Sequence, residues 1–271
     1  MRARKLKKSE ASIPVGLTIA GSDNSGGAGI QADLKTMTSL GIYGCSAVTC
    51  VVAEHPGTVK NITSIPTQRV LDQVQLTFEA FPVAAMKTGM LFSRSIIECL
   101  STWREKQRRR VPLVVDPVMV ATSGGLLLKK TAIRALQEKW IPLASCVTPN
   151  LYEAEVLLGY KILSEGEAEQ AARDSWQRWQ VPFLIKGGHL AGRQAIDFLY
   201  DGKKMTRLSS PRVARVKTHG TGCTYSAALM SYLAAGSGLL EAARNAKVFV
   251  SKAIEMRFRL GRYTPLNHIQ N

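Results

Sequence analysis

The sequence predicts an α/β protein with a mostly parallel sheet covered by helices on both faces. Short apolar runs alternate with segments of helical periodicity, which is the pattern of repeated βαβ units. Many of these runs end in a polar or glycine-rich segment, as expected where the carboxyl ends of parallel strands meet at a binding site. A chain of 271 residues, 45% of them hydrophobic, can bury a large core. A single domain is expected, because no repeat, low-complexity tract or linker interrupts the pattern.

The first half of the chain begins with the clearest strand. Val15–Ala20 is a continuous apolar run and leads through a glycine-rich turn into a helical segment, Ile30–Leu40, which Gly41 can end. Cys45–Ala53 is apolar and β-branched, so it predicts a second buried strand before a turn at 55–57. The other elements expected in this half are helices at Thr67–Glu79 and Ser93–Gln107 and strands at Ala84–Lys87 and Pro112–Asp116.

The second half repeats the alternation. The expected strands are Ser145–Thr148, Val181–Lys186 and a hairpin of Ala195–Tyr200 with Lys204–Leu208, and the expected helices are Lys129–Trp140, Asn150–Leu158, Gly220–Ala235 and Leu239–Arg257. The polar residues at the predicted strand ends are Asp23, Glu54, Lys87, Asp116, Asn150 and Lys186. Either Thr58–Thr67 or Ala191–Asp197 could act as a lid over a site at this edge.

Charge and composition limit the classes of partner. The formal net charge is +16, which makes polyanions a class to consider. Five of the basic residues lie in Met1–Lys8, and residues 1–12 are expected to form a solvated tail. The others are scattered without interleaved aromatic residues, so nucleic acid is not an expected partner. No apolar run reaches the ~18–20 residues of a membrane span. Five cysteines without CxxC spacing fit the reduced thiols of a cytoplasmic protein.

The first glycine-rich turn, Gly26–Gly29, opens a predicted helix and can bind phosphate. Its backbone N–H groups and the positive end of the helix dipole attract anions. The turn matches the Gly-x-Gly-x-x-Ala spacing of dinucleotide-binding segments, and Glu54 lies 25 residues beyond it. A nicotinamide-dependent dehydrogenase is therefore one interpretation. It is not a P-loop, because no Lys-Ser or Lys-Thr pair follows the glycines.

A second such turn, Gly220–Cys223, opens a long helix of small residues. Its amides suit an oxyanion or a phosphoryl group, which speaks against a dehydrogenase, although tight helix packing through glycine is an alternative. Cys223 stands at the helix N-terminus, where the dipole is expected to favour the thiolate. His219 is expected to be a structural hydrogen-bonding residue, because no second His or Cys stands at metal-ligand spacing.

Six segments in order resemble the hydroxymethylpyrimidine/phosphomethylpyrimidine kinases of thiamine biosynthesis, within the ribokinase-like superfamily. The segments are LTIAGSDNSGGAGIQADLKT (17–36), MKTGML (86–91), VVDPVMVATSG (114–124), TPNLYEAEVLLG (148–159), IKGGHL (185–190) and THGTGCTYSAAL (218–229). The resemblance implies a ribokinase-like three-layer α/β/α sandwich with a mostly parallel central sheet, covering residues 13–260 and followed by a C-terminal tail at 261–271. It implies transfer of the ATP γ-phosphoryl group to 4-amino-5-hydroxymethyl-2-methylpyrimidine, and then to its monophosphate. It also implies Mg²⁺ and a homodimer.

The resemblance also implies site roles. Gly220, Thr221 and Gly222 form an anion hole, and Cys223 accepts the hydroxyl proton or orients the alcohol. The implied ATP contacts are Asn150, Lys186 and Thr221, the implied magnesium ligands are Asp116 and Glu153, and the implied pyrimidine contacts are Gly21, Ala28, Asp33, Glu54, Met90 and Val118. Structural alternatives stay open: Asn150 and Glu153 have the spacing of a helix capping box, and Asp33 suits the first turns of a helix without any ligand.

Three departures from the family pattern bear on the substrate. Glu54 stands where relatives often carry Gln, and an ionised carboxylate only accepts hydrogen bonds, whereas an amide both donates and accepts. Gly125 stands where an Asp is expected, and Gly261–Asn271 follows the family's ending only loosely. A pyridoxal/pyridoxine kinase of vitamin B6 salvage is therefore the alternative enzyme.

Overall fold

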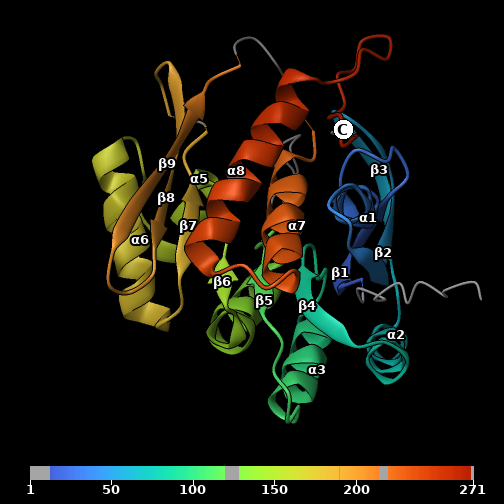
Figure 1. The fold of residues 1–271 in the computed structure, drawn as a ribbon. Helices are drawn as coiled ribbons and strands as arrows, with labels where there is room; N and C mark the ends of the chain where they lie inside the picture. The colour runs from blue at the N-terminus through green and yellow to red at the C-terminus, as the bar shows by residue number, and fades with distance from the viewer. Residues whose placement is uncertain (1–12, 120–127, 189, 214–218, 270–271) are drawn as a thin grey trace, which may run out of the picture.

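A computed structural model describes residues 13–119, 128–188, 190–213 and 219–269. Its strands are β1 (Val15–Asp23), β2 (Tyr43–His55), β3 (Thr58–Ser64), β4 (Val83–Thr88), β5 (Leu113–Val115), β6 (Cys146–Val147), β7 (Phe183–Lys186), β8 (Gln194–Tyr200) and β9 (Met205–Pro211). Within the described residues they form one sheet in the order β3-β2-β1-β4-β5-β6-β7-β8-β9 (Figure 1). The six strands from β2 to β7 in this order pair in parallel. The predicted, mostly parallel sheet is confirmed.

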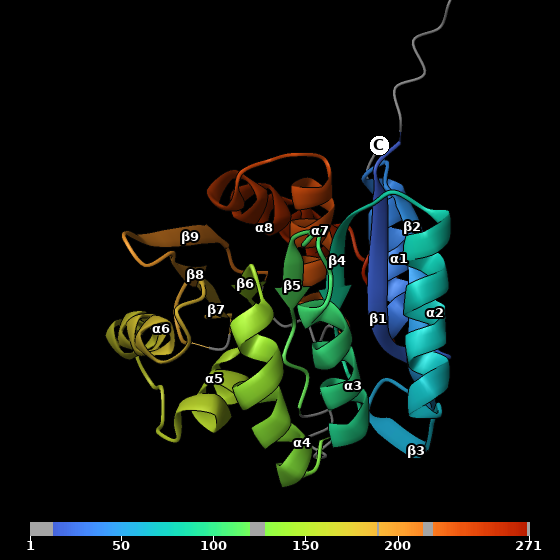
Figure 2. The same cartoon turned by 90° about the horizontal axis from the view of Figure 1, so that it is seen from below.

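Helices cover both faces of the sheet, as Figure 2 shows from below. One layer consists of α1 (Gly29–Ser39), α7 (Thr221–Ala234) and α8 (Leu239–Glu255). The other consists of α2 (Thr67–Ala80), α3 (Arg94–Glu105), α4 (Lys130–Ala135), α5 (Leu151–Leu158) and α6 (Glu165–Trp179). After α4 the chain continues through a π-helical turn, η1 (Leu136–Trp140), and a 3₁₀ turn, η2 (Ile141–Leu143). The three-layer sandwich expected from the resemblance is therefore observed.

Each face of the sheet has its own core, because successive side chains of a strand point to opposite sides. In β5, Leu113 and Val115 pack with the layer that contains α2 and α3, whereas Val114 packs with α7 and α8. All three side chains are fully buried. Strands that are buried on both faces read as continuous apolar runs, which explains why β1 and β4 were predictable.

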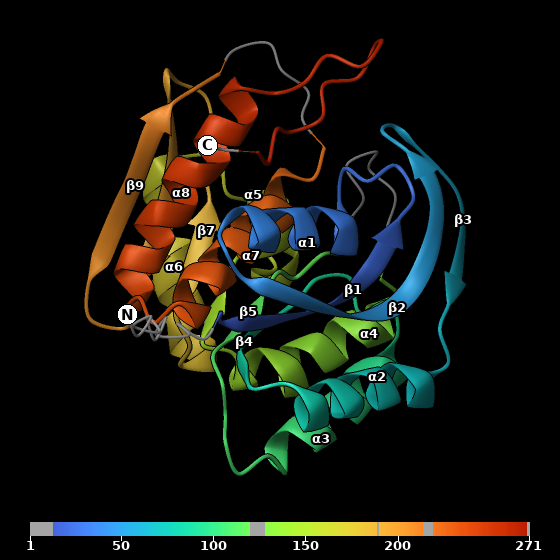
Figure 3. The ribbon, with the colours of Figure 1, turned by 45° about the vertical axis from the view of Figure 1, so that its right-hand side comes forward.

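Two elements were not predicted. β3 is an exposed edge strand that pairs with β2 in antiparallel register, from His55↔Thr58 to Cys50↔Ser64, so most of the segment considered as a lid is part of the sheet. Figure 3 shows β2 and β3 curving away together at that edge. α6 begins at Ser164 with a capping box to Glu167. The expected basic tail at residues 1–12 and the departure at Gly125 lie outside the described residues.

The chain after α8 folds back onto the domain. Leu266 and His268 are 3% and 6% exposed, so this part of the expected C-terminal tail packs on the domain, whereas Gly261, Arg262 and Ile269 are exposed. In Figure 1 this red segment loops out beyond α8 and returns toward α1. None of the helices in the described ranges combines the length and the apolar character that crossing a bilayer requires.

Candidate active site

One cavity of about 400 Å³ lies at the carboxyl ends of the parallel strands. Of the residues predicted for the site, those that line it are Gly21, Ala28, Glu54, Met90, Asp116, Val118, Asn150, Glu153, Lys186, Gly220, Thr221, Gly222 and Cys223. They come from the ends of six strands (β1, β2, β4, β5, β6 and β7), from the segments that follow these strands, and from the start of α7. The structure therefore brings these residues together at the strand ends, as the sequence predicted. Asp33 is the one predicted site residue that does not line the cavity.

The two glycine-rich turns meet at this cavity. A Cβ atom built on Gly220 would overlap the carbonyl oxygen of Gly27, and Gly220 has a φ of +78°, which favours glycine. A Cβ atom on Gly27 would lie 2.7 Å from Cδ2 of His219. The backbone N–H of Gly29 lies close enough to the Cys223 thiol to lower its pKa. The N-terminal ends of α1 and α7 therefore face each other with little space between their backbones.

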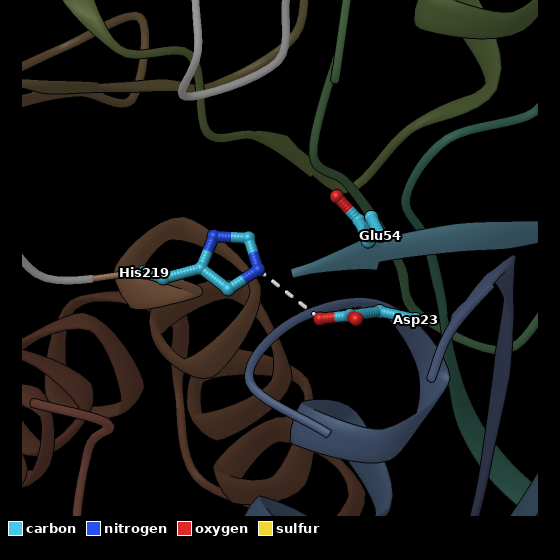
Figure 4. A group of neighbouring side chains, drawn as sticks. All are labelled: Asp23, Glu54 and His219. Carbon is cyan, nitrogen blue, oxygen red and sulfur yellow. Dashed lines mark hydrogen bonds and ion pairs between the residues drawn. The ribbon is translucent and has the colours of Figure 1, made fainter. Parts of the chain in front are cut away.

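Asp23 and His219 link these turns side chain to side chain (Figure 4). His219 Nε2 lies 3.1 Å from Asp23 Oδ2, and the same carboxylate accepts the backbone N–H groups of Ser25 and Ala28 at 2.7 and 2.8 Å. Burial opposes ionisation, but the hydrogen bonds from His219, Ser25 and Ala28 lower the pKa of Asp23 to about 2. His219 has the structural hydrogen-bonding role expected from the sequence.

Glu54 stands at the end of β2, beside this pair. The ligand atoms of Asp23, Glu54 and His219 lie within 4.8 Å of one another, a spacing that a metal ion could bridge. The Asp23 carboxylate is already engaged by His219 and its own turn, however, so the group is better described as a hydrogen-bonded link. Burial and the nearby Asp23 raise the pKa of Glu54, while His219 lowers it. Asn24 accepts the Glu54 backbone N–H at 2.7 Å and fixes the strand end.

A buried ion pair lies under the second turn. Lys186 Nζ donates to Asp116 Oδ1 at 3.0 Å, and Ser226 on α7 donates to Asp116 Oδ2 at 3.1 Å. A Cβ atom on Gly222 would lie 3.2 Å from Lys186 Nζ, so the ammonium group directly underlies the backbone of the turn. A positive charge next to the N-terminus of α7 strengthens the attraction of this place for a phosphate group.

Asn150 and Glu153 satisfy both interpretations drawn from the sequence. They form a capping box at the start of α5, with each backbone N–H donating to the other side chain at 2.9 Å. Both residues also line the cavity. Burial raises the pKa of Glu153 and the nearby Asp116 raises it further, whereas Lys186 lowers it. A cation in the cavity would favour the ionised form of this carboxyl group.

Asp33 lies behind the cavity wall. Its side chain is fully buried and accepts hydrogen bonds from Thr18 Oγ1 and Lys87 Nζ, both at 2.6 Å. Lys87 is equally buried, so neither group reaches the cavity directly. The sequence placed Lys87 at a strand end but could not show that its partner would be Asp33. A pyrimidine contact of Asp33 stays a prediction that this geometry does not support.

Cys223 lies at the N-terminus of α7, as predicted, but its thiol differs from the expectation. Burial raises the pKa of Cys223 to about 12, although Lys87 and the Gly29 N–H lower it. Desolvation of the sulfur opposes the effect expected of the helix dipole, so a neutral thiol is expected at rest.

The phosphomethylpyrimidine kinase family model matches residues 23–267, which include both glycine-rich turns and the strand ends between them. The chain belongs to this family. It is 42% identical to the hydroxymethylpyrimidine/phosphomethylpyrimidine kinases of Rhizobium meliloti and Haemophilus influenzae, over 91% and 93% of its length and 92% and 95% of theirs. It is 45% identical to a thiamine biosynthesis bifunctional protein of Geobacter sulfurreducens over 93% of its length, but spans only 52% of that longer relative.

Solved structures agree on the fold. A phosphomethylpyrimidine kinase of Clostridium difficile superposes with a TM-score of 0.78 at 38% identity, covering 89% of this chain and 99% of that one. An ADP complex of Bacillus subtilis pyridoxal kinase superposes with a TM-score of 0.86 at 37% identity, covering 95% and 98%. The ribokinase-like fold is confirmed and the chain is a phosphotransferase, which leaves the dehydrogenase interpretation of the first turn without support.

Proposed function

We propose that this chain transfers the γ-phosphoryl group of ATP to 4-amino-5-hydroxymethyl-2-methylpyrimidine and then to the resulting monophosphate. The observation that carries the proposal is the meeting of the two glycine-rich turns in one cavity, with the Lys186–Asp116 pair beneath one of them. An anion and a small neutral ring can then lie side by side. The relatives named for both phosphorylations support the same activity.

The acceptor end of the cavity is apolar apart from the carboxylates of Glu54 and Asp23. Met90 packs with Val52, and Val118 lies against the same cluster, which provides flat apolar walls for a heteroaromatic ring. Gly21 has no room for a side chain, since a Cβ atom would lie 2.8 Å from Cε of Met90. Glu54 at the rim can accept a hydrogen bond from the exocyclic amino group of an aminopyrimidine.

The phosphate end consists of the amides of Gly220, Thr221 and Gly222, with Lys186 below them. Phosphoryl transfer through a loose transition state depends mainly on positioning and on cancelling the charge of the phosphoryl oxygens. Cys223, neutral at rest, would orient the attacking hydroxyl group rather than remove its proton beforehand. The positive net charge of the chain would help to attract ATP.

Asp116 and Glu153 fit a magnesium site, because both are oxygen donors on the cavity wall and the Asp116 charge opposes ionisation of Glu153. Asp116 already accepts from Lys186 and Ser226, so water-mediated contact suits the pair. When bound, Mg²⁺ would neutralise charge on the phosphates. Asn150 would hold the backbone of this wall in place through its capping box.

A second substrate class is vitamin B6 alcohols, because a pyridoxal kinase of Staphylococcus aureus in complex with AMP-PCP and pyridoxal superposes with a TM-score of 0.86 at 34% identity. Purified protein supplied with ATP and each alcohol in turn distinguishes the two through their kcat/KM values. A higher value for the aminopyrimidine, with two successive products by mass spectrometry, is the expected result. Preference for pyridoxal or pyridoxine would overturn the proposal.

We further propose a cytoplasmic homodimer, as the family resemblance implies. The positive charge and the absence of a membrane-spanning helix in the described ranges are compatible with such an enzyme. Sedimentation equilibrium of the purified chain measures the oligomeric state, and a monomer at micromolar concentration would contradict the dimer.

A further inference from the structure

The segment that follows α8 makes a buried contact with α7, the helix that begins at the second glycine-rich turn. The chain turns back through a bridge between Leu260 and Tyr263, and the backbone N–H of Asn267 donates to the carbonyl oxygen of Ala253 at 3.1 Å. Leu266 then enters the core and brings His268 to the first turn of α7. The segment expected to be a C-terminal tail therefore contacts Thr224, which is adjacent to the cavity-lining residue Cys223.

His268 meets Thr224, the residue that follows Cys223. His268 Nε2 lies 2.9 Å from Thr224 Oγ1, and the two residues are 6% and 0% exposed. The Thr224 backbone N–H donates to the Gly220 carbonyl oxygen at 2.9 Å, so Thr224 closes the first hydrogen-bonded turn of α7. A hydrogen bond to this side chain therefore acts on the turn that carries the anion hole.

The first turn of α7 needs such support. Its N-cap residue is Gly220, which has no side chain with which to cap the helix, and Gly222 follows two residues later. Glycine adds backbone freedom at both positions. An anion hole works only when its N–H groups are aimed before the reaction, because their reorganisation would otherwise add to the barrier. A hydrogen bond from outside the helix can restrict the backbone of this first turn.

The surroundings of His268 favour its neutral form. Burial, and to a lesser degree the positive charge of Lys35, lower the pKa of His268 to about 4. Lys35 on α1 is exposed and donates to the Gly26 carbonyl oxygen at 2.7 Å, within the first glycine-rich turn. His268 thus lies near both helices whose N-terminal ends face each other, and it stays uncharged in the physiological range.

We propose that His268 is a positioning residue for phosphoryl transfer: through Thr224 it holds the first turn of α7, and with it Cys223 and the amides of Gly220–Gly222, in the reactive arrangement. The proposal rests on the proposed function, because it assigns His268 to the same anion hole. His268 is not among the residues that line the cavity. Its effect should therefore appear in the rate of the chemical step and only weakly in the binding of ATP or of the alcohol.

The test compares His268→Ala, His268→Gln and Thr224→Val with the wild type in a steady-state assay with ATP and the aminopyrimidine alcohol. We expect His268→Ala to lower kcat roughly tenfold or more, with each KM changed less than about threefold. Gln can place an amide near the former Nε2 position, so His268→Gln should recover part of kcat. The double variant His268→Ala/Thr224→Val should have a kcat no lower than that of the slower single variant, because each substitution removes the same hydrogen bond.

Tyr263→Phe is the matched control. Tyr263 belongs to the same segment, and its hydroxyl lies 3.2 Å from His55 Nδ1, away from α7. This variant should keep the wild-type kcat, and thermal unfolding should show all variants folded at the assay temperature. An unchanged kcat in folded His268→Ala would overturn the inference, as would a loss that His268→Gln does not reduce. A wild-type protein that phosphorylates no alcohol would overturn the proposed function and the inference with it.

Discussion

Lys186 Nζ lies 3.0 Å from Asp116 Oδ1, and the two side chains are only 12% and 2% exposed. The pair joins the end of β7 to the loop after β5 directly below the backbone of Gly222. In the proposed function, this position would give a cation to the phosphate end of the cavity and would neutralise a carboxylate that would otherwise repel phosphate. The pair is therefore expected to contribute to both activity and stability.

Lys186→Met should lower kcat/KM for ATP by about two orders of magnitude, because it removes the cation under the anion hole. It should also lower the free energy of unfolding by about 3 kcal/mol or more, since Asp116 is left buried without its cation. Steady-state kinetics and urea denaturation measure the two effects. Lys161→Met is the control, because its ion pair with Glu155 is 76% exposed on the lysine side and should matter little. Equal effects of both variants would argue against the role of Lys186.

Cys223→Ala should lower turnover by roughly two orders of magnitude if the thiol touches the reacting alcohol. Because burial raises the pKa of Cys223 to about 12, the pH–rate profile should show no inflection near the usual thiol value of 9.0. Turnover measured between pH 6 and 10, with pyruvate kinase and lactate dehydrogenase reporting ADP, tests both points. Unchanged turnover in Cys223→Ala would assign the residue to packing alone.

Glu54→Gln should alter how the KM for the alcohol depends on pH. The pKa of Glu54 is raised by burial and by Asp23, so its carboxylate is protonated at a higher pH than usual. As the pH falls through this raised pKa, the carboxylate is lost as an acceptor and the KM of the wild type should rise. Gln does not titrate, so the variant should lack this limb. An equal rise in KM at low pH in the wild type and in Glu54→Gln would show that another group titrates.

Asp23→Asn should destabilise the protein in a pH-dependent way. The pKa of Asp23 is lowered from 3.8 to about 2, which corresponds to about 2 kcal/mol of stability above pH 4. Because the pKa is lower in the folded state, this stability is present above the unfolded value and disappears as the pH falls toward 2. Urea denaturation of both proteins at pH 7 and pH 3 should show a difference that shrinks at the lower pH. Exposed Glu79, changed to Gln, is the control and should show no such trend.

The sequence predicted those features that depend on neighbouring residues. Apolar runs marked the buried strands, and glycine-rich segments marked the turns that line the cavity. β3 was missed because Thr58–Ser64 is an exposed edge strand with polar residues at most positions. α6 was missed although Ser164 and Glu167 have capping-box spacing, a signal that could have identified it.

Contacts between residues far apart in the sequence could not be predicted from local sequence patterns. Asp33 is predicted as a substrate contact, and the sequence could not show that its side chain pairs with Lys87, 54 residues away. The thiol of Cys223 looked activated because helix position can be read from the sequence, whereas desolvation by the rest of the fold cannot. His268 and Thr224 are 44 residues apart, and nothing local to either position indicates that they meet.

The link between Asp23 and His219 spans 196 positions of the chain, so residues from near both of its ends build the cavity. A chain truncated before α7 would keep the mid-chain residues Asp116 and Lys186 but would lack the second glycine-rich turn and the His219 link. Such a truncated chain is therefore expected to be unable to transfer phosphate from ATP.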